Sequence, residues 1–307
     1  MRPSATARCP AANEYNTKRH MEPKFRIAAI TDEFSPGDLD ASLDRMASIG
    51  MTGAELRLVF GKNIMDLSGD ELKLAKEKLD ARGMEVMSIA SPILKCVLPG
   101  GPDIDPRFQH DMFASKHTFE DQPRLAEHAF SIAKFMGAKI VRVFSYWRTV
   151  EPEKCFDGVV TALTWLCEKA EEQGLIIGLE NEHACNIATA KETAAILAVM
   201  KQPNLKVVWD PANALCSGES PYPEGYSLLP PDRIVHVHTK DCHMEGHKPV
   251  WGPLGTRDID WKGQIAALRN DGYTGWLSLE THWPGPDGDK FQGSTICGWN
   301  LRGLAAL

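Results

Sequence analysis

The stretch EEQGLIIGLENEH, residues 171–183, shows in one place the pattern that decides the fold. A polar helical segment ends at Gly174, and the apolar run 175–179 then has the length and composition of a buried strand. The strand ends in Glu180, and the polar tripeptide NEH follows. Glycine at such a junction takes the left-handed conformation that ends a helix before the chain turns back. The stretch therefore predicts a helix, a tight turn and a buried strand with polar groups at its carboxyl end.

The same junction recurs along the chain. A helical pattern, a glycine and an apolar run follow one another at Gly50, Gly83, Gly137, Gly174 and Gly272. Five uses of one junction indicate a repeated unit of strand and helix, although no residue-level repeat is visible. Such units build a parallel sheet, which is either open and doubly wound or closed into a barrel.

Eight runs of residues are predicted to be strands: Phe25–Ile30, Ala54–Leu58, Glu85–Ile89, Ile140–Phe144, Leu175–Glu180, Leu205–Trp209, Ile234–Thr239 and Gly275–Glu280. Predicted helices between them include Leu39–Ile49, Asp70–Arg82, Pro123–Met136, Phe156–Glu172, Ala190–Met200 and Trp261–Asn270. The first strand lacks the G-x-G-x-x-G of a dinucleotide-binding sheet. Eight units fit a (β/α)₈ TIM barrel better, and a two-domain split is the weaker alternative because no linker-like stretch divides the chain. We predict a single α/β barrel domain over 25–307, with long βα loops and a C-terminal tail.

Composition narrows the class of protein further. The 307 residues carry a net charge of −7, with 43% hydrophobic and 24% charged residues, as expected of a globular chain. No apolar stretch approaches the roughly 20 residues that cross a bilayer. The eight cysteines contain no C-x-x-C pair and are predicted to be scattered buried thiols. Residues 1–24 lack the apolar core of a signal peptide, so we predict a flexible N-terminal extension and a cytoplasmic protein.

Ionisable residues stand where four consecutive predicted strands end. They are Glu180, Asp210, the pair His236 and His238, and Glu280. The chemistry of a barrel of this kind is located at the carboxyl ends of its strands. Each residue alone is more often a solvated strand end or a core histidine, but four at equivalent ends are unlikely to coincide by chance. A mixed set of oxygen and nitrogen donors suits a divalent ion such as Mn²⁺, Co²⁺, Mg²⁺ or Zn²⁺.

Five motifs resemble those of the xylose-isomerase-like TIM barrels, a family of sugar isomerases and epimerases that includes the type IV AP endonucleases. The motifs are LEN at 179–181, WDPAN at 209–213, HVHTKD at 236–241, GPLGTRDID at 252–260 and LSLETH at 277–282. Ketose 3-epimerases of that family bind one divalent ion through a Glu, an Asp, a His and a Glu. The resemblance assigns these ligands to Glu180, Asp210, His238 and Glu280. The family's ligand is the second histidine of the H-x-H pair, so His236 would support the site or face the substrate.

The chain departs from the endonuclease branch at the positions that bind its additional metal ions. Asn213 stands where that branch has a further histidine, and Ser91-Pro92 and Phe144-Ser145 occupy two strand ends where it needs others. Residues 249–251 (PVW) replace an Asp-x-His. Together with the net charge of −7, these departures argue against a nucleic-acid partner.

The resemblance implies a metal-dependent sugar isomerase or epimerase. Such an enzyme removes a proton next to a metal-bound carbonyl of a keto-sugar and passes through an enediolate. Glu180 and Glu280 would be the acid–base pair, and Mn²⁺ is the first choice of metal. The alternative is a lyase of the same fold, which would dehydrate keto-inositols or cleave 3-keto glycosides, including C-glycosides, by β-elimination. A non-catalytic sugar-binding barrel is a third hypothesis. We expect a homo-oligomer, or a complex with a small subunit if the chain is a glycoside lyase.

Further side chains could bind the sugar: Arg57, Lys95, Arg142, His183, His236, Asn213 and Arg257. Glu55, two residues before Arg57, could also grip a polyol. Arg57 could equally be a surface ion-pair residue. Arg142 lies inside an apolar strand, where an unpaired charge is costly, so we expect it to pair with an inward-facing carboxylate.

Two stretches are predicted to be irregular. Ser91–Asp121 has weak periodicity, and its length suggests a lid over the site with His110 and His117 as its titratable histidines. Pro211–Asp232 is rich in proline, glycine and serine and is predicted to replace a regular helix with a loop.

Overall fold

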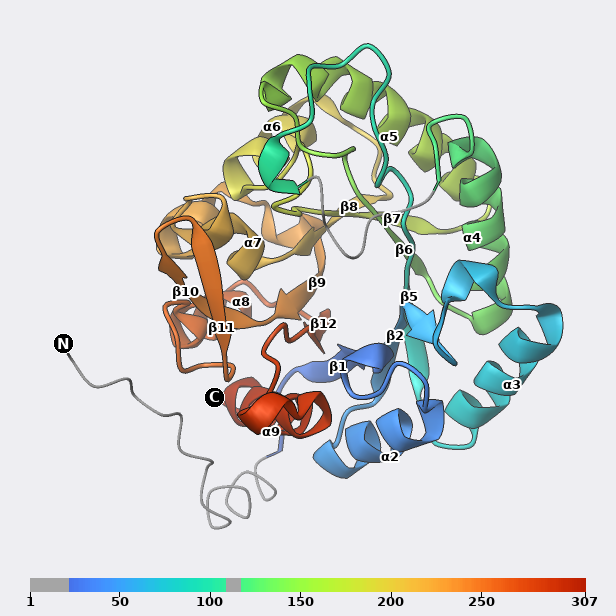
Figure 1. Ribbon diagram of the computed structural model, residues 1–307, viewed down its shortest axis with the longest axis vertical. Helices are drawn as coiled ribbons and strands as arrows, with labels where there is room; N and C mark the ends of the chain where they lie inside the picture. The colour runs from blue at the N-terminus through green and yellow to red at the C-terminus, as the bar shows by residue number, and fades with distance from the viewer. Residues whose placement is uncertain (1–21, 109–116) are drawn as a thin grey trace.

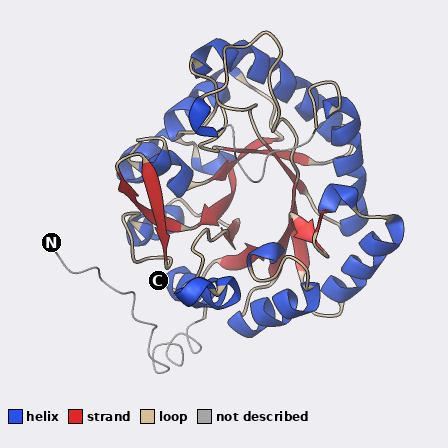
Figure 2. Cartoon of the chain, viewed as in Figure 1, coloured by secondary structure: helices blue, strands red, loops and turns tan. Residues whose placement is uncertain are grey.

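Eight parallel strands close into a barrel surrounded by helices (Figures 1 and 2). The computed structural model describes residues 22–108 and 117–307. In chain order around the ring, the strands are β1 (Arg26–Ile30), β2 (Gly53–Leu56), β5 (Glu85–Ala90), β6 (Ile140–Val143), β7 (Ile176–Glu180), β8 (Leu205–Trp209), β9 (Ile234–Thr239) and β12 (Trp276–Leu279). The last strand pairs with the first, with Trp276 opposite Arg26. The chain therefore forms a single TIM barrel.

The helices cover the outside of the barrel and bury their apolar faces against it. They are α2 (Leu39–Ile49), α3 (Gly69–Asp80), α4 (Gln122–Met136), α5 (Phe156–Glu171), α6 (Ala190–Val199), α7 (Pro211–Cys216), α8 (Trp261–Asn270) and α9 (Lys290–Ala305). Local sequence signals fix several of their starts. In α3, for example, Ser68 and Glu71 form a capping box in which each side chain bonds the other's backbone N–H. The main hydrophobic core lies between this outer layer and the strands.

The predicted fold class and all eight predicted strands are confirmed, and every predicted strand or helix end lies within two residues of the observed one. The five junction glycines, Gly50, Gly83, Gly137, Gly174 and Gly272, have φ values of 91°, 63°, 82°, 69° and 68°. These are left-handed conformations, so the glycines end their helices as the sequence predicts.

One expectation about an irregular segment was wrong, and the C-terminal tail, for which no element was predicted, is largely helical. The C-terminal tail contains helix α9, whose glycines weaken the helical signal but allow close packing. A Cβ at Gly298 would lie 2.7 Å from Ile49 Cδ1 of α2. The stretch Pro211–Asp232 begins with the short helix α7, because the Asp210 side chain accepts a hydrogen bond from Asn213 N and proline favours the first helical position.

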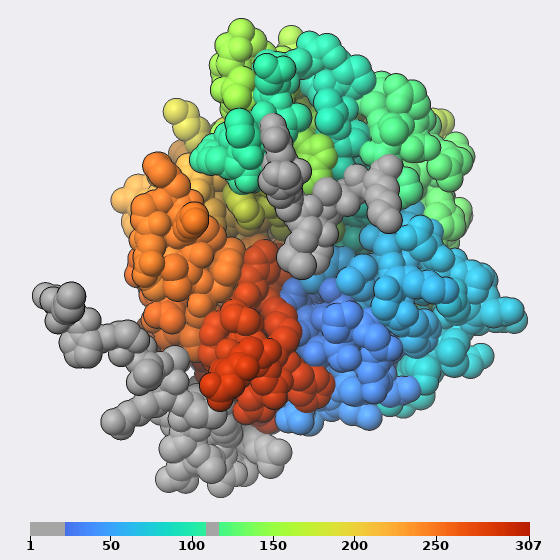
Figure 3. Space-filling view, viewed as in Figure 1, coloured from blue at the N-terminus to red at the C-terminus, as the bar shows by residue number. Residues whose placement is uncertain are grey.

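Two antiparallel hairpins that the sequence did not predict extend the βα loops. One pairs β3 (Leu58–Val59) with β4 (Lys62–Asn63), and the other pairs β10 (Asp241–Glu245) with β11 (Lys248–Gly252). The space-filling view in Figure 3 shows the second hairpin (orange) beside α9 (red). The Asn300 side chain of α9 donates a hydrogen bond to Leu254 O, just after this hairpin.

The inside of the barrel changes from apolar to polar toward the carboxyl ends of the strands. At the amino end, Ala28, Met87 and Trp276 form a small buried cluster separate from the main core. The guanidinium of Arg26 lies 3.9 Å from the Trp276 ring centroid. Farther along the strands the buried side chains include Glu55, His238 and Glu180. The buried charged groups of the barrel interior therefore lie toward the carboxyl end.

Some predictions concern residues outside the described ranges. Of the N-terminal extension only 22–24 are described, and Lys24 N donates to Ala305 O at 2.7 Å. Residues 109–116 of the predicted lid, with His110, also lie outside. Seven of the eight cysteines are described; none of these forms a disulfide, and all but Cys216 are buried as expected. None of the helices in 22–108 and 117–307 is long and apolar enough to cross a membrane.

Candidate metal centre

Four buried side chains converge at the carboxyl ends of four neighbouring strands. Glu180 ends β7, Asp210 directly follows β8, His238 lies in β9 and Glu280 directly follows β12. Their exposed fractions are 0%, 0%, 0% and 4%. One donor atom from each lies within 4.8 Å of the donor atoms of the other three. The strand order thus brings together residues that are up to 100 positions apart in the sequence.

The imidazole of His238 stands at the centre of this group. Its Nδ1 lies 3.1 Å from Glu180 Oε1, 3.3 Å from Glu280 Oε2 and 3.7 Å from Asp210 Oδ2. Its other nitrogen, Nε2, faces Glu55 at 3.0 Å. Burial disfavours the charged ring, but Glu55, Glu180 and Glu280 outweigh it and raise the pKa of His238 well above its ordinary value.

Each of the three carboxylates also faces a cation. Arg142 Nη1 lies 2.9 Å from Glu180 Oε2, which confirms that Arg142 pairs with an inward-facing carboxylate. Lys240 Nζ lies 2.8 Å from Asp210 Oδ2 and 2.9 Å from Glu280 Oε2. Burial alone would raise the pKa of Glu280, but the charges of Lys240 and His238 hold it well below its ordinary value.

The donor set fits a divalent ion. Three carboxylates and one imidazole are the mixed ligands that Mn²⁺, Zn²⁺ and similar ions accept. Asp210 Oδ2 is buried and makes no hydrogen bond of good geometry to any described residue, despite the nearby Lys240 ammonium. A buried carboxylate oxygen without a hydrogen bond is costly, and a metal ion would satisfy it.

Arg57 lies in a buried ion network, where it contacts Glu280, and its side chain is only 11% exposed. Its Nη1 is 3.0 Å from Glu280 Oε1, and its Nη2 is 2.8 Å from Asp32 Oδ2 and 2.7 Å from Glu33 Oε1. The surface ion pair considered for Arg57 is therefore wrong. The guanidinium instead holds one oxygen of Glu280 while the other faces His238 and Lys240.

A second polar group borders the carboxylates on the side of α7. Asn213 donates from Nδ2 to Glu180 Oε1 at 3.4 Å, and its Oδ1 lies 3.0 Å from His183 Nδ1. His183 Nδ1 also lies 3.0 Å from Glu182 Oε1. Burial opposes protonation of His183, yet the Glu182 carboxylate outweighs this and raises the pKa of His183 to about 9. The imidazole is therefore mainly a cation at neutral pH.

Lys95 lies against the aromatic side chains that follow β6. It is 6% exposed, and its Nζ is 4.5 Å from the Phe144 ring centroid and 5.3 Å from that of Trp147. The residues just before Lys95 and Trp147 are Leu94 and Tyr146, with φ values of 61° and 63°. Left-handed conformations at bulky residues cost about 1–3 kcal/mol each and cluster at functional sites. The backbone next to Lys95 and Trp147 is therefore strained.

Two further predicted residues have different surroundings. His236 is fully buried, and its Nε2 lies 3.4 Å from Glu55 Oε1. Arg257 is only partly buried, and its Nε makes no hydrogen bond to any described residue. A Cβ at Gly252 would lie 2.0 Å from that Nε, so the absence of a side chain at Gly252 allows the guanidinium to approach the backbone.

Sequence reasoning gave Lys240 no role and did not connect Glu55 with His238. Glu55 was considered as a group that could grip a polyol, but it has no exposed surface and contacts His238 and Ser278. Lys240 follows His238 by two residues, and this alternation, which places both side chains on one side of a strand, was the signal available. No local pattern shows that Glu55 of β2 reaches across to β9.

Comparison with known proteins places these observations in a family. A family model described as xylose isomerase-like TIM barrel matches residues 43–295. A comparison with curated proteins gave no match. Many solved structures are similar in fold. The IolI protein with a bound zinc atom is 17% identical, with a TM-score of 0.67, and the match covers 92% of this chain and 98% of that one.

Two further structures have similar scores. A probable 3-DHS dehydratase, AsbF, from Bacillus anthracis is 18% identical (TM-score 0.65; 89% of this chain, 97% of that one). A sugar phosphate isomerase/epimerase from Parabacteroides distasonis is 15% identical (TM-score 0.63; 91% and 93%). The chain spans 41% of a longer relative, a xylose isomerase-like TIM barrel/4-hydroxyphenylpyruvate dioxygenase fusion protein (20% identical, TM-score 0.66, 89% of this chain). At these identities the likeness shows the fold alone.

Proposed function

Because this chain belongs to the xylose isomerase-like TIM barrel family, we propose that it is a divalent-metal-dependent isomerase or epimerase of a keto-sugar. The observation that carries the proposal is the buried convergence of Glu180, Asp210, His238 and Glu280. Two glutamates in this cluster approach one imidazole nitrogen, at 3.1 and 3.3 Å, from strands separated by β8 and β9. A proton acceptor and a proton donor can thus stand on two sides of one substrate.

In this proposal the four residues are the metal ligands, with His238 binding through Nδ1. Mn²⁺ is the preferred ion, with Co²⁺, Mg²⁺ and Zn²⁺ as alternatives; the related IolI structure holds zinc. When bound, the ion supplies Lewis-acid polarisation of the substrate's carbonyl oxygen.

The proton transfers fall to the two glutamates. Glu180 removes the proton from the carbon next to the carbonyl, and Glu280 returns a proton to the other face or to the neighbouring carbon. Arg142 binds Glu180 Oε2 and Arg57 binds Glu280 Oε1, so the arginines hold each carboxylate in place through one oxygen. The second oxygen of each glutamate faces the cluster, where it can act on a ligand.

Substrate binding is assigned to the rim of this cluster. Lys95, His183, Asn213 and Arg257 would donate hydrogen bonds to sugar hydroxyls, as polar groups placed around a pocket do. Arg57 and Arg142 contribute mainly by holding the glutamates. His236 is fully buried beside Glu55, so of its two expected roles the geometry favours support of the site.

A lyase is the second candidate. Dehydration of a keto-inositol and β-elimination from a 3-keto glycoside begin with the same proton abstraction. The similarity to a probable dehydratase supports a lyase reaction as the second candidate. An isomerase or epimerase conserves the substrate's mass, whereas a lyase releases water or an aglycone, so the leaving group separates the two.

The test combines metal analysis with a reaction screen. Purified protein is analysed for bound metal, loaded with Mn²⁺, and incubated in D₂O with ketoses, inososes and 3-keto glycosides while NMR follows each substrate. We expect about one ion per chain and deuterium incorporation at a carbon next to the carbonyl, with conserved mass. Release of water or aglycone would establish the lyase. Sugar binding without exchange, or protein that binds no metal, would contradict the proposal in favour of a binding protein.

A further inference from the structure

We propose that Glu55 positions His238 for metal binding by fixing which ring nitrogen faces the carboxylate cluster. The inference rests on the proposed function, because it concerns the ligand set assigned there. Glu55 belongs to β2, on the other side of the barrel interior from the strands that supply Glu180 and Asp210. It contacts none of the three carboxylates that would hold the ion, so its effect on the ion passes through His238.

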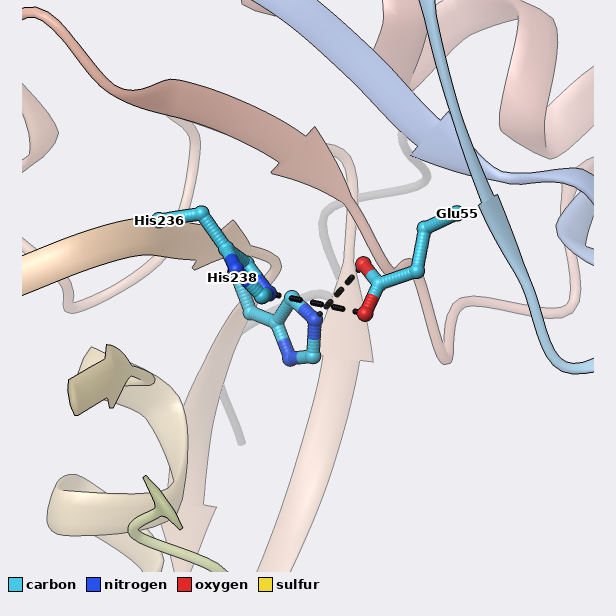
Figure 4. Close-up of side chains that lie close together, drawn as sticks. All are labelled: Glu55, His236 and His238. Atoms are coloured by element: carbon cyan, nitrogen blue, oxygen red, sulfur yellow. Dashed lines mark hydrogen bonds and ion pairs between the residues drawn. The ribbon is translucent and has the colours of Figure 1, made fainter. Parts of the chain in front are cut away.

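Glu55, His236 and His238 form a buried triad, shown in Figure 4. Its Oε2 lies 3.0 Å from His238 Nε2 and accepts a hydrogen bond from Ser278 Oγ at 2.9 Å. Its Oε1 lies 3.4 Å from His236 Nε2. All four side chains are 0% exposed. The Glu55 carboxylate therefore faces two imidazoles and one hydroxyl away from solvent.

The triad fixes the tautomer of His238. A carboxylate only accepts hydrogen bonds, so with a divalent ion on Nδ1 the one hydrogen of the neutral ring is on Nε2 and is donated to Glu55. The lone pair is then on Nδ1, which lies 3.1–3.7 Å from oxygens of the three carboxylates. A metal-binding histidine that donates its other N–H to a carboxylate is held in orientation and becomes a better ligand.

Energetics favour a role beyond packing. Glu55 Oε1 and both nitrogens of His236 are buried and make no hydrogen bond to any described residue. Polar groups buried in this way cost free energy, and a well-packed apolar residue of similar volume often stabilises a fold as well or better. The His236 ring lies 5.1 Å from the His238 ring, centroid to centroid, and limits its tilt.

The same triad also has the spacing of a second cation site, because the donor atoms of Glu55, His236 and His238 lie within 4.8 Å of one another. We favour the positioning role. A second ion would need the Nε2 lone pair of a His238 that already binds through Nδ1, and the ring would have to lose its last proton. The number of ions bound per chain separates the two.

The experiment compares the wild type with Glu55→Gln and with Ser88→Ala as the matched control. Ser88 is the β5 register partner of Glu55, equally buried, and its Oγ makes no hydrogen bond to a described residue. Each metal-free protein is titrated with Mn²⁺ by calorimetry, and bound metal is counted by mass spectrometry. The Zn²⁺-loaded forms are compared by ¹H–¹⁵N NMR of the His238 ring. Metal-free melting curves show whether each variant folds.

We expect one ion per chain, a Kd for Mn²⁺ raised about 10- to 100-fold in Glu55→Gln, and an unchanged Kd in Ser88→Ala. The Nε2–H resonance of His238 should shift in Glu55→Gln only, which a packing role would not cause. An unchanged Kd and resonance in Glu55→Gln would overturn the positioning role alone. Two ions in the wild type and one in Glu55→Gln would replace it with a second metal site. A wild type that binds no ion would overturn the proposed function as well.

Discussion

The two ends of the barrel contain ion pairs of the same kind in opposite surroundings. At the amino end, Arg26 and Glu85 lie 3.2 Å apart with side chains 51% and 56% exposed. At the carboxyl end, Arg142 and Glu180 lie 2.9 Å apart with side chains 6% and 0% exposed. The two pairs have similar distances between their charges, but only the pair at the amino end is exposed to water.

This difference separates stability from function. Exposed ion pairs contribute little to the free energy of unfolding, because water already solvates both charges. Buried charges lose that solvation and are stable only when each has an oppositely charged or hydrogen-bonding partner. Burying several charges at one place therefore costs folding free energy that an apolar core would not. An apolar cluster around Trp276 lies at the amino end. At the carboxyl end, Arg142 pairs with Glu180, and Lys240 pairs with both Asp210 and Glu280.

The largest effect is expected for the two glutamates at the carboxyl end. Glu180→Gln and Glu280→Gln should lower the rate of solvent deuterium exchange by about 10²- to 10⁴-fold, because each variant loses a proton-transfer group. The rate is measured by NMR with the best substrate of the screen. Glu85→Gln, at the amino end, is the control and should keep the wild-type rate. A glutamine variant as active as this control would remove the proposed acid–base pair.

Breaking the buried pair should be the largest stability effect. Arg142→Met leaves Glu180 buried without its guanidinium, and we expect a loss of about 3–5 kcal/mol in the free energy of unfolding. Urea denaturation of chelator-treated protein measures it. Since a bound divalent ion would itself compensate Glu180, the loss should shrink when metal is added. A loss below about 1 kcal/mol would place this pair with the exposed ones.

Metal should stabilise the folded chain through the carboxyl end only. At a free concentration of 100 times Kd, a single bound ion adds about 2.7 kcal/mol to the free energy of unfolding. Melting curves with and without Mn²⁺ should show this gain in the wild type and in Glu85→Gln. Asp210→Asn can still cap α7 but should lose most of the gain. An equal gain in Asp210→Asn would show that the ion binds elsewhere.

The charge of His183 should depend on Glu182. The pKa of His183 is raised from 6.5 to about 9, so the charged pair stabilises the fold fully below pH 6.5 and this contribution is lost as the pH rises through 9. NMR titration of the His183 ring should give a midpoint near 9, and Glu182→Gln should move the midpoint downward. A midpoint that stays at 9 in Glu182→Gln would assign the shift to another group.

The smallest effect is expected at the amino end. Glu85→Gln removes the ion pair with Arg26 but leaves the guanidinium over Trp276. We expect a change within about 1 kcal/mol in the free energy of unfolding, falling toward zero as salt screens the charges. Urea denaturation at low and high salt measures it. A loss as large as that of Arg142→Met would remove the contrast between the two ends.

Local patterns predicted the elements of this fold well. Apolar runs give the strands, and glycine junctions such as Gly50 and Gly137 end helices where predicted, because these signals lie within a few neighbouring residues. Helix α9 was not predicted, because its local sequence signal is weak. Glycines such as Gly293 and Gly298 weaken its helical signal, and only the close contacts of Gly293 with Gly285 and of Gly298 with Ile49 in the folded chain account for them.

The sequence by itself determined the eight repeated units, and with them the barrel that collects Glu180, Asp210, His238 and Glu280 at one end. Only the tertiary structure decided the partners of these residues. Glu55 lies 183 positions from His238, and Arg57 lies 223 positions from Glu280. The reason is that burial and ion pairing depend on distances across the closed barrel. Residue spacing along the chain does not encode those distances.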